Sequence, residues 1–361
     1  MCQTPTQLDT DLKIATQTQI VSMSGINPTN CPTLEMTGSW AGGKMIFSDS
    51  PESPTSRGKL YYDVAVPATT GSDYHRVFLY HVNNKASGKM KFSVLIKNNT
   101  TASATLTLQK SGSAGPTTSY LYGGKLSYQR WLSSSAGSAR TVASGAWIRL
   151  DTVFDALQAS PNNLLHGIWD YSMTQPHQIL VVALDANDDP ITVGPGLSLL
   201  SRDTHQRGTF PFCDKVYDTA PSVVFETSGN IKSFPVGGGT APDDHAVGVD
   251  ATDGTAMTLS GNFGINHKMH LAMTSSDGKN IGILINPRGG QWGGAVWAMS
   301  GVFPSGKFLI PAGTASTGDN TKGAVEGKYA PGTGSLNVWA QFMPTGGSSL
   351  PVRFVLVPYT P

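Results

Sequence analysis

The chain has 361 residues and a formal net charge of +1, and only 14 % of its residues are charged, against about 25 % in an ordinary domain. The Lys and Arg residues are scattered without a basic stripe, which argues against nucleic acid as a partner. No apolar run reaches the roughly 18 residues of a membrane span. A hydrophobic content of 39 %, in short runs separated by 41 Gly and 23 Pro, argues against disorder and predicts an all-β protein.

Residues 1–35 are rich in Thr and Gln, with single Ile and Val residues among them. This pattern predicts an extended N-terminal arm that carries at most one strand. The arm is either a frayed terminus or a strand that pairs with the sheet edge of another subunit. The first 21 residues have neither a basic nor an apolar region of the kind found in signal peptides, so no signal peptide is expected and the export route is left open.

Three cysteines, Cys2, Cys31 and Cys213, cannot all pair within one chain. One interpretation is that they are unrelated thiols. The other is a cross-link between subunits through Cys2 or Cys31, because an odd count in an extracellular protein suggests pairing between molecules. Cys2 lies on a polar terminal segment from which its thiol can reach a neighbour.

Alternating apolar and polar residues predict strands along the first half of the chain. Lys89–Ile96 and Ala102–Leu108 are separated by a short polar turn and predict an antiparallel hairpin. Leu60–Val66 and Arg76–Val82 precede them at a spacing of about a dozen residues, which is typical of a sandwich or jelly roll. Trp147–Leu157 fits either a helix or a strand that ends in a single turn.

A proline-containing stretch without stable periodicity separates the two halves, and strands resume after it. The predicted fold is therefore all-β, with two tandem antiparallel β-sandwich domains of the jelly-roll type behind the extended N-terminal arm. The predicted segments are an arm at 1–35, a first sandwich at 36–205, a connector at 206–222 and a second sandwich at 223–361.

The second half contains a weak copy of a segment from the first. His75–Leu79 aligns with His267–Leu271, and Val94–Asn98 aligns with Ile283–Pro287. Such an internal repeat favours two related domains. The alternative is that any two strand pairs built from similar residues resemble each other in this way.

Three stretches are similar to known sequences: Leu95–Thr100, Gly112–Tyr122 and Asn286–Gly294. Over residues 58–360 the chain resembles an uncharacterised group of all-β proteins of Gram-positive bacteria, mostly surface-associated or secreted. The resemblance implies a location at the cell surface, outside the cell or on a spore. It brings no catalytic residues with it.

Aromatic residues beside glycines are candidates for stacking against a sugar, although such rings more often fill sandwich cores. The candidates are Tyr122, Tyr128, Trp131, Trp292 and Trp297. Arg288 lies in a glycine-rich loop, where it can bind an anion or order its own loop.

Two acidic turns are weak candidates for calcium, which prefers several oxygen ligands. The candidate ligands are Asp185, Asp188 and Asp189 in one turn, and Asp243, Asp244 and Asp250 in the other. Neither turn has the EF-hand spacing, and solvated turns are the alternative. No other cofactor is expected, and no catalytic motif is present, so the sequence predicts a protein that is not an enzyme.

These features predict a non-enzymatic structural subunit that associates with itself in a bacterial surface, filament or spore-associated assembly. The near-zero net charge favours this function, because close self-association then meets little electrostatic repulsion. The alternatives are a carbohydrate-binding or adhesion module for cell-wall or surface glycan, and a capsid-like jelly-roll coat subunit.

Overall fold

The computed structural model describes residues 2–65, 67, 74–219, 224–292, 296–298, 307–309 and 321–361. The chain divides into two compact units that consist mainly of strands, which confirms the all-β class. Unit 1 comprises Met1–Trp40, Asp214–His245 and Ser260–Pro361, and unit 2 comprises Ala41–Cys213 and Ala246–Leu259. The units are therefore interleaved along the chain, whereas consecutive domains were expected. The expected connector at 206–222 contains one strand of each unit.

Unit 2 contains two sheets that enclose one core. In spatial order, its larger sheet consists of β17 (Thr255–Leu259), β16 (Ala246–Asp250), β12 (Arg207–Phe210), β3 (Met45–Ser48), β5 (His75–Val82), β10 (Leu164–Met173), β7 (Ala104–Thr117) and β8 (Arg140–Val142). Its smaller sheet consists of β4 (Gly58–Ala65), β11 (His177–Asp185), β6 (Met90–Asn98) and β9 (Trp147–Arg149). Leu79 and Trp169 of the larger sheet pack in one cluster with Phe92 and Val181 of the smaller.

The strands expected at Lys89–Ile96 and Ala102–Leu108 are present as β6 and β7, but the predicted hairpin between them is wrong. β6 pairs with β11 and β9, whereas β7 pairs with β10 and β8 in the other sheet. The cause is that β6 is buried on both faces: Val94 belongs to the main core and Leu95 to a second apolar cluster. Such a strand needs partners on both edges in the middle of its own sheet.

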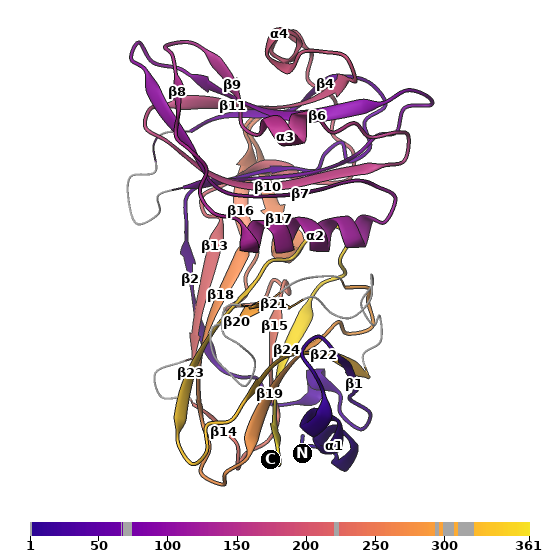
Figure 1. Cartoon of the computed structure of the whole chain (residues 1–361), viewed down its shortest axis with the longest axis vertical. Helices are drawn as coiled ribbons and strands as arrows, with labels where there is room; N and C mark the ends of the chain where they lie inside the picture. Colours follow the sequence, from indigo (N-terminus) through magenta and orange to yellow (C-terminus); the bar gives the residue numbers. More distant parts are fainter. Residues whose placement is uncertain are drawn as a thin grey trace. The chain divides into compact units, whose positions relative to one another are not determined.

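Unit 2 also contains α2 (Tyr120–Ser133), α3 (Thr152–Asp155), α4 (Pro190–Val193) and the short 3₁₀ turn η2 (Gly194–Gly196). Figure 1 shows α2 running along the larger sheet beside β7 and β10. Gly112 of β7 permits this close approach, because a Cβ atom there would overlap the backbone of Ser127 and Trp131. α3 is a single turn after β9, which confirms the second alternative for 147–157. Within the described ranges, no helix is both long and apolar enough to cross a membrane.

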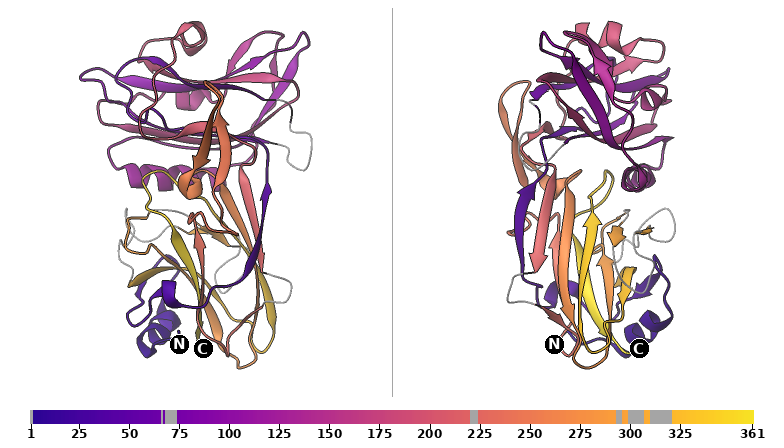
Figure 2. Two further views of the ribbon diagram at one scale, coloured as in Figure 1. Left: turned by 180° about the vertical axis from the view of Figure 1, so that it is seen from behind. Right: turned by 60° about the vertical axis from the view of Figure 1, so that its left-hand side comes forward.

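Unit 1 likewise contains two sheets around a core. Its first sheet consists of β1 (Ile20–Ser22), β22 (Lys322–Tyr329), β19 (Asn280–Asn286), β24 (Val352–Tyr359) and β15 (Lys232–Val236). Its second sheet consists of β2 (Met36–Ala41), β13 (Asp214–Thr219), β18 (Asn266–Thr274), β23 (Ser335–Phe342), β20 (Val296–Ala298) and β21 (Lys307–Leu309), with β14 (Phe225–Glu226) also paired to β18. The right-hand view of Figure 2 shows β2, β13, β18 and β23 side by side. Leu271 and Phe342 of the second sheet pack with Ile283 and Phe354 of the first.

The N-terminal residues of unit 1 do not form the extended arm that was expected. They form α1 (Thr6–Ile14), β1 and the 3₁₀ turn η1 (Pro28–Asn30). Elsewhere in unit 1, a further 3₁₀ turn, η3, spans Ser260–Asn262. Leu8 and Leu12 lie one turn apart on α1 and pack against the first sheet of unit 1, where Val355 and Val357 belong to the same cluster. Apolar residues four positions apart give a helix a buried stripe, which a search for strand periodicity misses.

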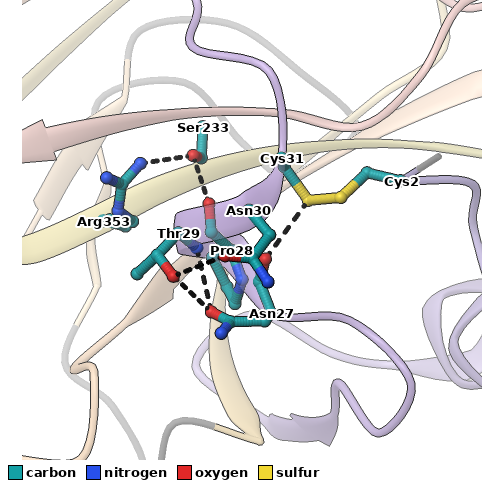
Figure 3. Close-up of a disulfide and its surroundings, with 8 residues drawn as sticks. All are labelled: Cys2, Asn27, Pro28, Thr29, Asn30, Cys31, Ser233 and Arg353. Atoms are coloured by element: carbon teal, nitrogen blue, oxygen red, sulfur yellow. Dashed lines mark hydrogen bonds between the residues drawn. A yellow bond between two sulfur atoms is a disulfide. The ribbon is translucent and has the colours of Figure 1, made fainter.

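Cys2 and Cys31 form a disulfide with each other, with their Cα atoms 5.3 Å apart (Figure 3). The predicted cross-link between subunits through either cysteine is therefore wrong, because the N-terminal segment folds back and brings the two thiols together. The Ser233 hydroxyl holds this segment in place, donating to the Pro28 carbonyl at 2.7 Å. Arg353 in turn donates to that hydroxyl oxygen at 2.6 Å.

Four strands occupy equivalent positions in the two units. In unit 2, β5 pairs with β10 in one sheet, and the strands that follow them, β6 and β11, pair in the other. In unit 1, β18 pairs with β23, and the strands that follow them, β19 and β24, pair in the other sheet. The internal repeat in the sequence falls on β5 and β6 in unit 2 and on β18 and β19 in unit 1.

Candidate functional site

The outer face of the second sheet of unit 1 carries an exposed tryptophan. Along β18 and β23, alternate side chains such as Leu271 and Phe342 face the core, and the side chains between them face outward. Trp339 lies on this outer face and is 40 % exposed. No other tryptophan whose side chain the structure describes is exposed.

Asp218, His270 and Trp339 lie in one row across β13, β18 and β23. The Nδ1 atom of His270 lies 2.9 Å from Oδ1 of Asp218, so the carboxylate orients the imidazole. The imidazole stacks on the indole of Trp339, with ring centroids 4.5 Å apart and an interplanar angle of 19°. The two neighbours therefore hold the indole in a fixed orientation, with part of its surface open to solvent.

Neutral amides flank the tryptophan along the same strand. Asn337 and Gln341 lie two residues before and after Trp339 and therefore share its face of the sheet. On the neighbouring strand, the charge of Lys268 is matched by Asp214, whose carboxylate lies 2.6 Å from the ammonium group. The described surface around the indole thus carries amide side chains and little unpaired charge, and the Gln341 side-chain oxygen already accepts a hydrogen bond from Asn266 at 3.0 Å.

This arrangement suits a neutral, hydroxyl-rich ligand. An indole packs against the C–H groups on one face of a sugar ring, and amide side chains hydrogen-bond to its hydroxyl groups. Among the side chains that the structure describes on this face, no cluster of like charges matches a strongly charged ligand. Among the described residues, this row holds no nucleophile with an adjacent base.

The aromatic residues predicted for sugar stacking in the first half are not brought together on the surface. Tyr128 and Trp131 are buried, so their proposed role in stacking is wrong. Both lie on the face of α2 that packs toward β7, with Trp131 close to the buried Arg76 guanidinium. Tyr122 is 38 % exposed, on another side of the same helix.

In the second half, Trp292 is buried in the core of unit 1 and cannot stack against a ligand, so this prediction is also wrong. Trp297 belongs to β20, but its side chain lies outside the described part of the chain. Arg288 is exposed and adopts a positive φ of 55°. Its loop is ordered through Asn286, whose side-chain oxygen accepts a hydrogen bond from the Arg288 amide at 3.0 Å.

The first acidic turn is occupied by protein groups. Asp185 lies 2.7 Å from the Lys85 ammonium group. Asp188 accepts a hydrogen bond from the backbone amide of Asp185. Asp189 caps α4 and pairs with Arg149. Each carboxylate therefore already has a protein donor.

The second acidic set is divided between the two units. Asp243 accepts a hydrogen bond from a buried tyrosine hydroxyl at 2.7 Å, and Asp244 pairs with Lys215 at 2.6 Å, both within unit 1. Asp250 pairs with Arg207 at 2.9 Å within unit 2. Over the described residues, no group of three or more metal-ligating side chains is arranged to hold an ion. Neither predicted calcium set is assembled as a site.

No protein-family model matches the chain, and no curated protein is significantly similar to it. Among solved structures, two mutants of oxalate decarboxylase from Bacillus subtilis align over 98 % and 99 % of this chain and 84 % and 85 % of their own. Each is 9 % identical and gives a TM-score of 0.14. Scores this low establish no common fold with this chain.

Trp339 was not among the residues singled out from the sequence, although a signal for it was present. In Leu336–Phe342 the apolar residues at alternate positions define the buried face of a strand. The same alternation places Trp339 on the opposite, polar face. A tryptophan on the polar face of an amphipathic strand is a more specific signal than an aromatic-rich segment.

Proposed function

We propose that this chain is a non-catalytic glycan-binding protein that recognises a neutral sugar polymer through the outer face of the second sheet of unit 1. The supporting observation is the exposed indole of Trp339, fixed by His270 and Asp218 and flanked by amide side chains. The low content of charged residues, 14 %, fits a neutral ligand. A cell-wall or surface polysaccharide is the proposed partner.

The proposed location is the cell surface or the extracellular space. The Cys2–Cys31 disulfide supports it, because such bonds persist in oxidising compartments and are rare in the cytosol. The resemblance to surface-associated proteins of Gram-positive bacteria points in the same direction. Proteolytic shaving of intact cells, followed by detection of released peptides from this chain, tests the location.

The glycan-binding proposal is tested by measuring the affinity of the full chain for solubilised cell-wall polysaccharide. We expect Trp339→Ala to weaken binding at least about tenfold, which corresponds to about 1.4 kcal/mol. Tyr122→Ala is the matched control, because it removes another exposed aromatic ring and should leave binding unchanged. Both variants should keep the melting temperature of the wild type, since neither side chain is buried. Equal affinities for wild type and Trp339→Ala would refute the proposal.

His270→Ala tests the positioning of the indole. It leaves Trp339 in place but removes the ring on which it stacks. A partial loss of affinity, smaller than that of Trp339→Ala, is expected.

Self-association in a surface assembly is a second proposed function, and one observation favours it. β17 is the outermost strand of the larger sheet of unit 2, and on the adjacent β16 Val247 and Val249 are 66 % and 39 % exposed. An edge that exposes apolar residues is suited to pairing with another copy. The expected arm and cysteine cross-link no longer support this function.

The native mass of the protein tests the second proposal. Wild type should form a defined oligomer, and Val247→Lys should abolish it by placing a charge on the exposed face of β16, beside the edge strand. Val153→Lys is the control, because Val153 is 75 % exposed but lies on α3 and not in this sheet. A wild type that is monomeric at all accessible concentrations would eliminate this function.

The finer architecture, two related jelly-roll-like sandwich domains, is also proposed. The equivalent positions of β5, β6, β10 and β11 in unit 2 and β18, β19, β23 and β24 in unit 1 support it. An experimental structure in which the two four-strand sets superimpose would establish the relationship.

A further inference from the structure

Unit 2 contains a polar pocket of about 300 Å³ at the junction of β6, β9, α3 and the turn before α4. Lys91 of β6, Arg149 of β9 and Asp155 of α3 line it, together with the turn at 187–190. Ligand pockets span roughly 300 to 1,000 Å³, so this one has room for a small molecule.

The carboxyl group of Asp155 is buried beside this pocket, and its nearest protein partners are the Ser93 hydroxyl and the Arg149 guanidinium. Its side chain is only 4 % exposed, and among the described residues neither oxygen accepts a well-directed hydrogen bond. Burial raises the pKa of Asp155 to about 6, against the opposing effects of the Ser93 hydroxyl and the Arg149 charge. Buried carboxyl oxygens in proteins almost always have partners, so this group requires an explanation.

Arg149, next to Asp155, also has a buried nitrogen without a hydrogen bond among the described residues. One terminal nitrogen of its guanidinium pairs with Asp189, which also caps α4. Its Nε lies 3.6 Å from Oδ2 of Asp155, too far for a direct hydrogen bond, and this buried N–H has no other acceptor among the described residues. Among the described residues, one donor, Nε–H of Arg149, and two acceptors, the carboxyl oxygens of Asp155, are left without a well-directed hydrogen bond, and so is the Ser93 hydroxyl next to them. A molecule that both donates and accepts hydrogen bonds would satisfy the donor and both acceptors.

The charges around the pocket restrict the chemistry of such a molecule. Lys91 and Arg149 disfavour a cationic ligand, and Asp155, Asp188 and Asp189 disfavour an anionic one. A neutral hydroxyl group meets both requirements, because it donates to the carboxylate and accepts from Nε–H. We propose that this pocket is a binding site for a single neutral sugar ring, whose adjacent hydroxyl groups bridge Asp155 and Arg149. The site is independent of Trp339, which belongs to unit 1.

A larger pocket of about 410 Å³ in unit 1 lacks this property. Its charged groups are already satisfied: Asp9 accepts hydrogen bonds from Thr360, and Lys279 pairs with Asp277. The comparison shows that volume alone does not single out the pocket beside Asp155.

The test uses the full-length oxidised chain and a panel of free sugars: glucose, galactose, mannose and N-acetylglucosamine. Saturation-transfer NMR and calorimetry at neutral pH measure binding. At least one sugar should bind wild type and Trp339→Ala equally well. Asp155→Asn should weaken that binding at least about tenfold, because a neutral amide replaces a charged acceptor. Asp155→Leu should abolish it.

Asp185→Asn is the matched control, because it makes the same chemical change outside the pocket and should bind like wild type. Asp155→Asn should melt at or above the wild-type temperature, since it removes a buried carboxylate without good partners. Binding that Asp155→Asn leaves unchanged, or no sugar binding at all, would overturn the inference and leave a pocket that holds only water. Loss of polysaccharide binding in Trp339→Ala with intact monosaccharide binding would separate the two proposals.

Discussion

Arg76 and Asp170 form a two-point ion pair that is almost completely buried in unit 2. Nε of Arg76 lies 2.7 Å from Oδ1 of Asp170, and Nη2 lies 2.9 Å from Oδ2. The two residues face each other on β5 and β10, and Nη1 of the arginine donates to the Cys213 carbonyl at 2.6 Å. The guanidinium also lies 4.7 Å from the ring centroid of Trp131. The pair thus joins two strands, a loop and the helix α2.

Removing one partner of this pair should be strongly destabilising. Asp170→Asn removes the carboxylate charge that contacts the buried Arg76 guanidinium at two points, and the loss of unfolding free energy is expected to be about 3–5 kcal/mol by urea denaturation. Asp185→Asn breaks a partly exposed pair and should change stability by less than about 1 kcal/mol. Similar unfolding free energies for the two variants would show that the buried pair contributes no more to stability than the partly exposed pair.

The disulfide should stabilise unit 1 chiefly by restricting the unfolded chain. Cys2 and Cys31 are 29 residues apart, and a loop of that length corresponds to about 3–4 kcal/mol in the chain-entropy model. Cys2→Ser/Cys31→Ser should therefore unfold at lower denaturant concentration than the oxidised wild type. Reductant should lower the wild-type midpoint to that of the double variant and leave the variant unchanged. If reductant also lowered the midpoint of the double variant, the loss of stability could not be attributed to the Cys2–Cys31 disulfide.

Three buried histidines should make the protein less stable in acid. Burial lowers the pKa of His81, His166 and His177 to about 4, 3 and 4 from the ordinary value of 6.5. The unfolded chain therefore binds these protons first, so stability falls as the pH drops below about 6.5 and continues to fall toward the folded pKa values. Asp155 acts in the opposite sense, because its raised pKa favours the protonated folded state below about pH 6.

His166 provides the most direct test of this acid sensitivity. Neither ring nitrogen has a hydrogen-bond partner among the described residues, and the ring lies against Phe78 and Tyr80. His166→Phe should be at least as stable as wild type at pH 7. Its advantage should grow by up to about 1.4 kcal/mol per pH unit between pH 6.5 and 4. An advantage that does not change with pH would contradict the assignment of a buried neutral imidazole.

Gly112 should not tolerate a side chain. In Gly112→Ala the new Cβ would overlap the backbone of Ser127 and Trp131, so α2 must shift from β7. The expected loss of unfolding free energy is about 1–3 kcal/mol or more, measured by denaturation. Gly137→Ala is the control: its Cβ would lie 3.7 Å from the Leu108 carbonyl oxygen, an ordinary contact, and it should be nearly neutral.

Strands could be predicted wherever alternation was strong, because period two is a local property of the chain. β24 is an example, since its apolar alternation was recognised directly. The aromatic segment that forms α2 was not recognised as helical, although Gly124, Tyr128 and Trp131 repeat at helical spacing on its buried face. Tyr and Trp also favour strands, and the two glycines in this segment weaken any helical signal.

The candidate sites required contacts between distant segments, which periodicity does not encode. Asp155 and Arg149 are close in sequence, but the pocket also needs Lys91 and the turn at 187–190. Trp339 and His270 become neighbours only through the register of β18 and β23. The disulfide was missed for the same reason, because it depends on how α1, β1 and η1 fold the chain between Cys2 and Cys31.

The interleaved order of the units has a consequence for protein synthesis. The first 40 residues of unit 1 leave the ribosome before all of unit 2, yet β1 pairs with β22, and Asp9 binds Thr360 near the last residue of the chain. The apolar face of α1 in the newly made N-terminal segment therefore stays uncovered until β22 and β24 have been synthesised. Cys2 and Cys31 emerge together early, so an oxidant can close this segment into a loop before its partner strands exist. A ribosome that stalls before β24 leaves a chain in which unit 1 cannot be completed.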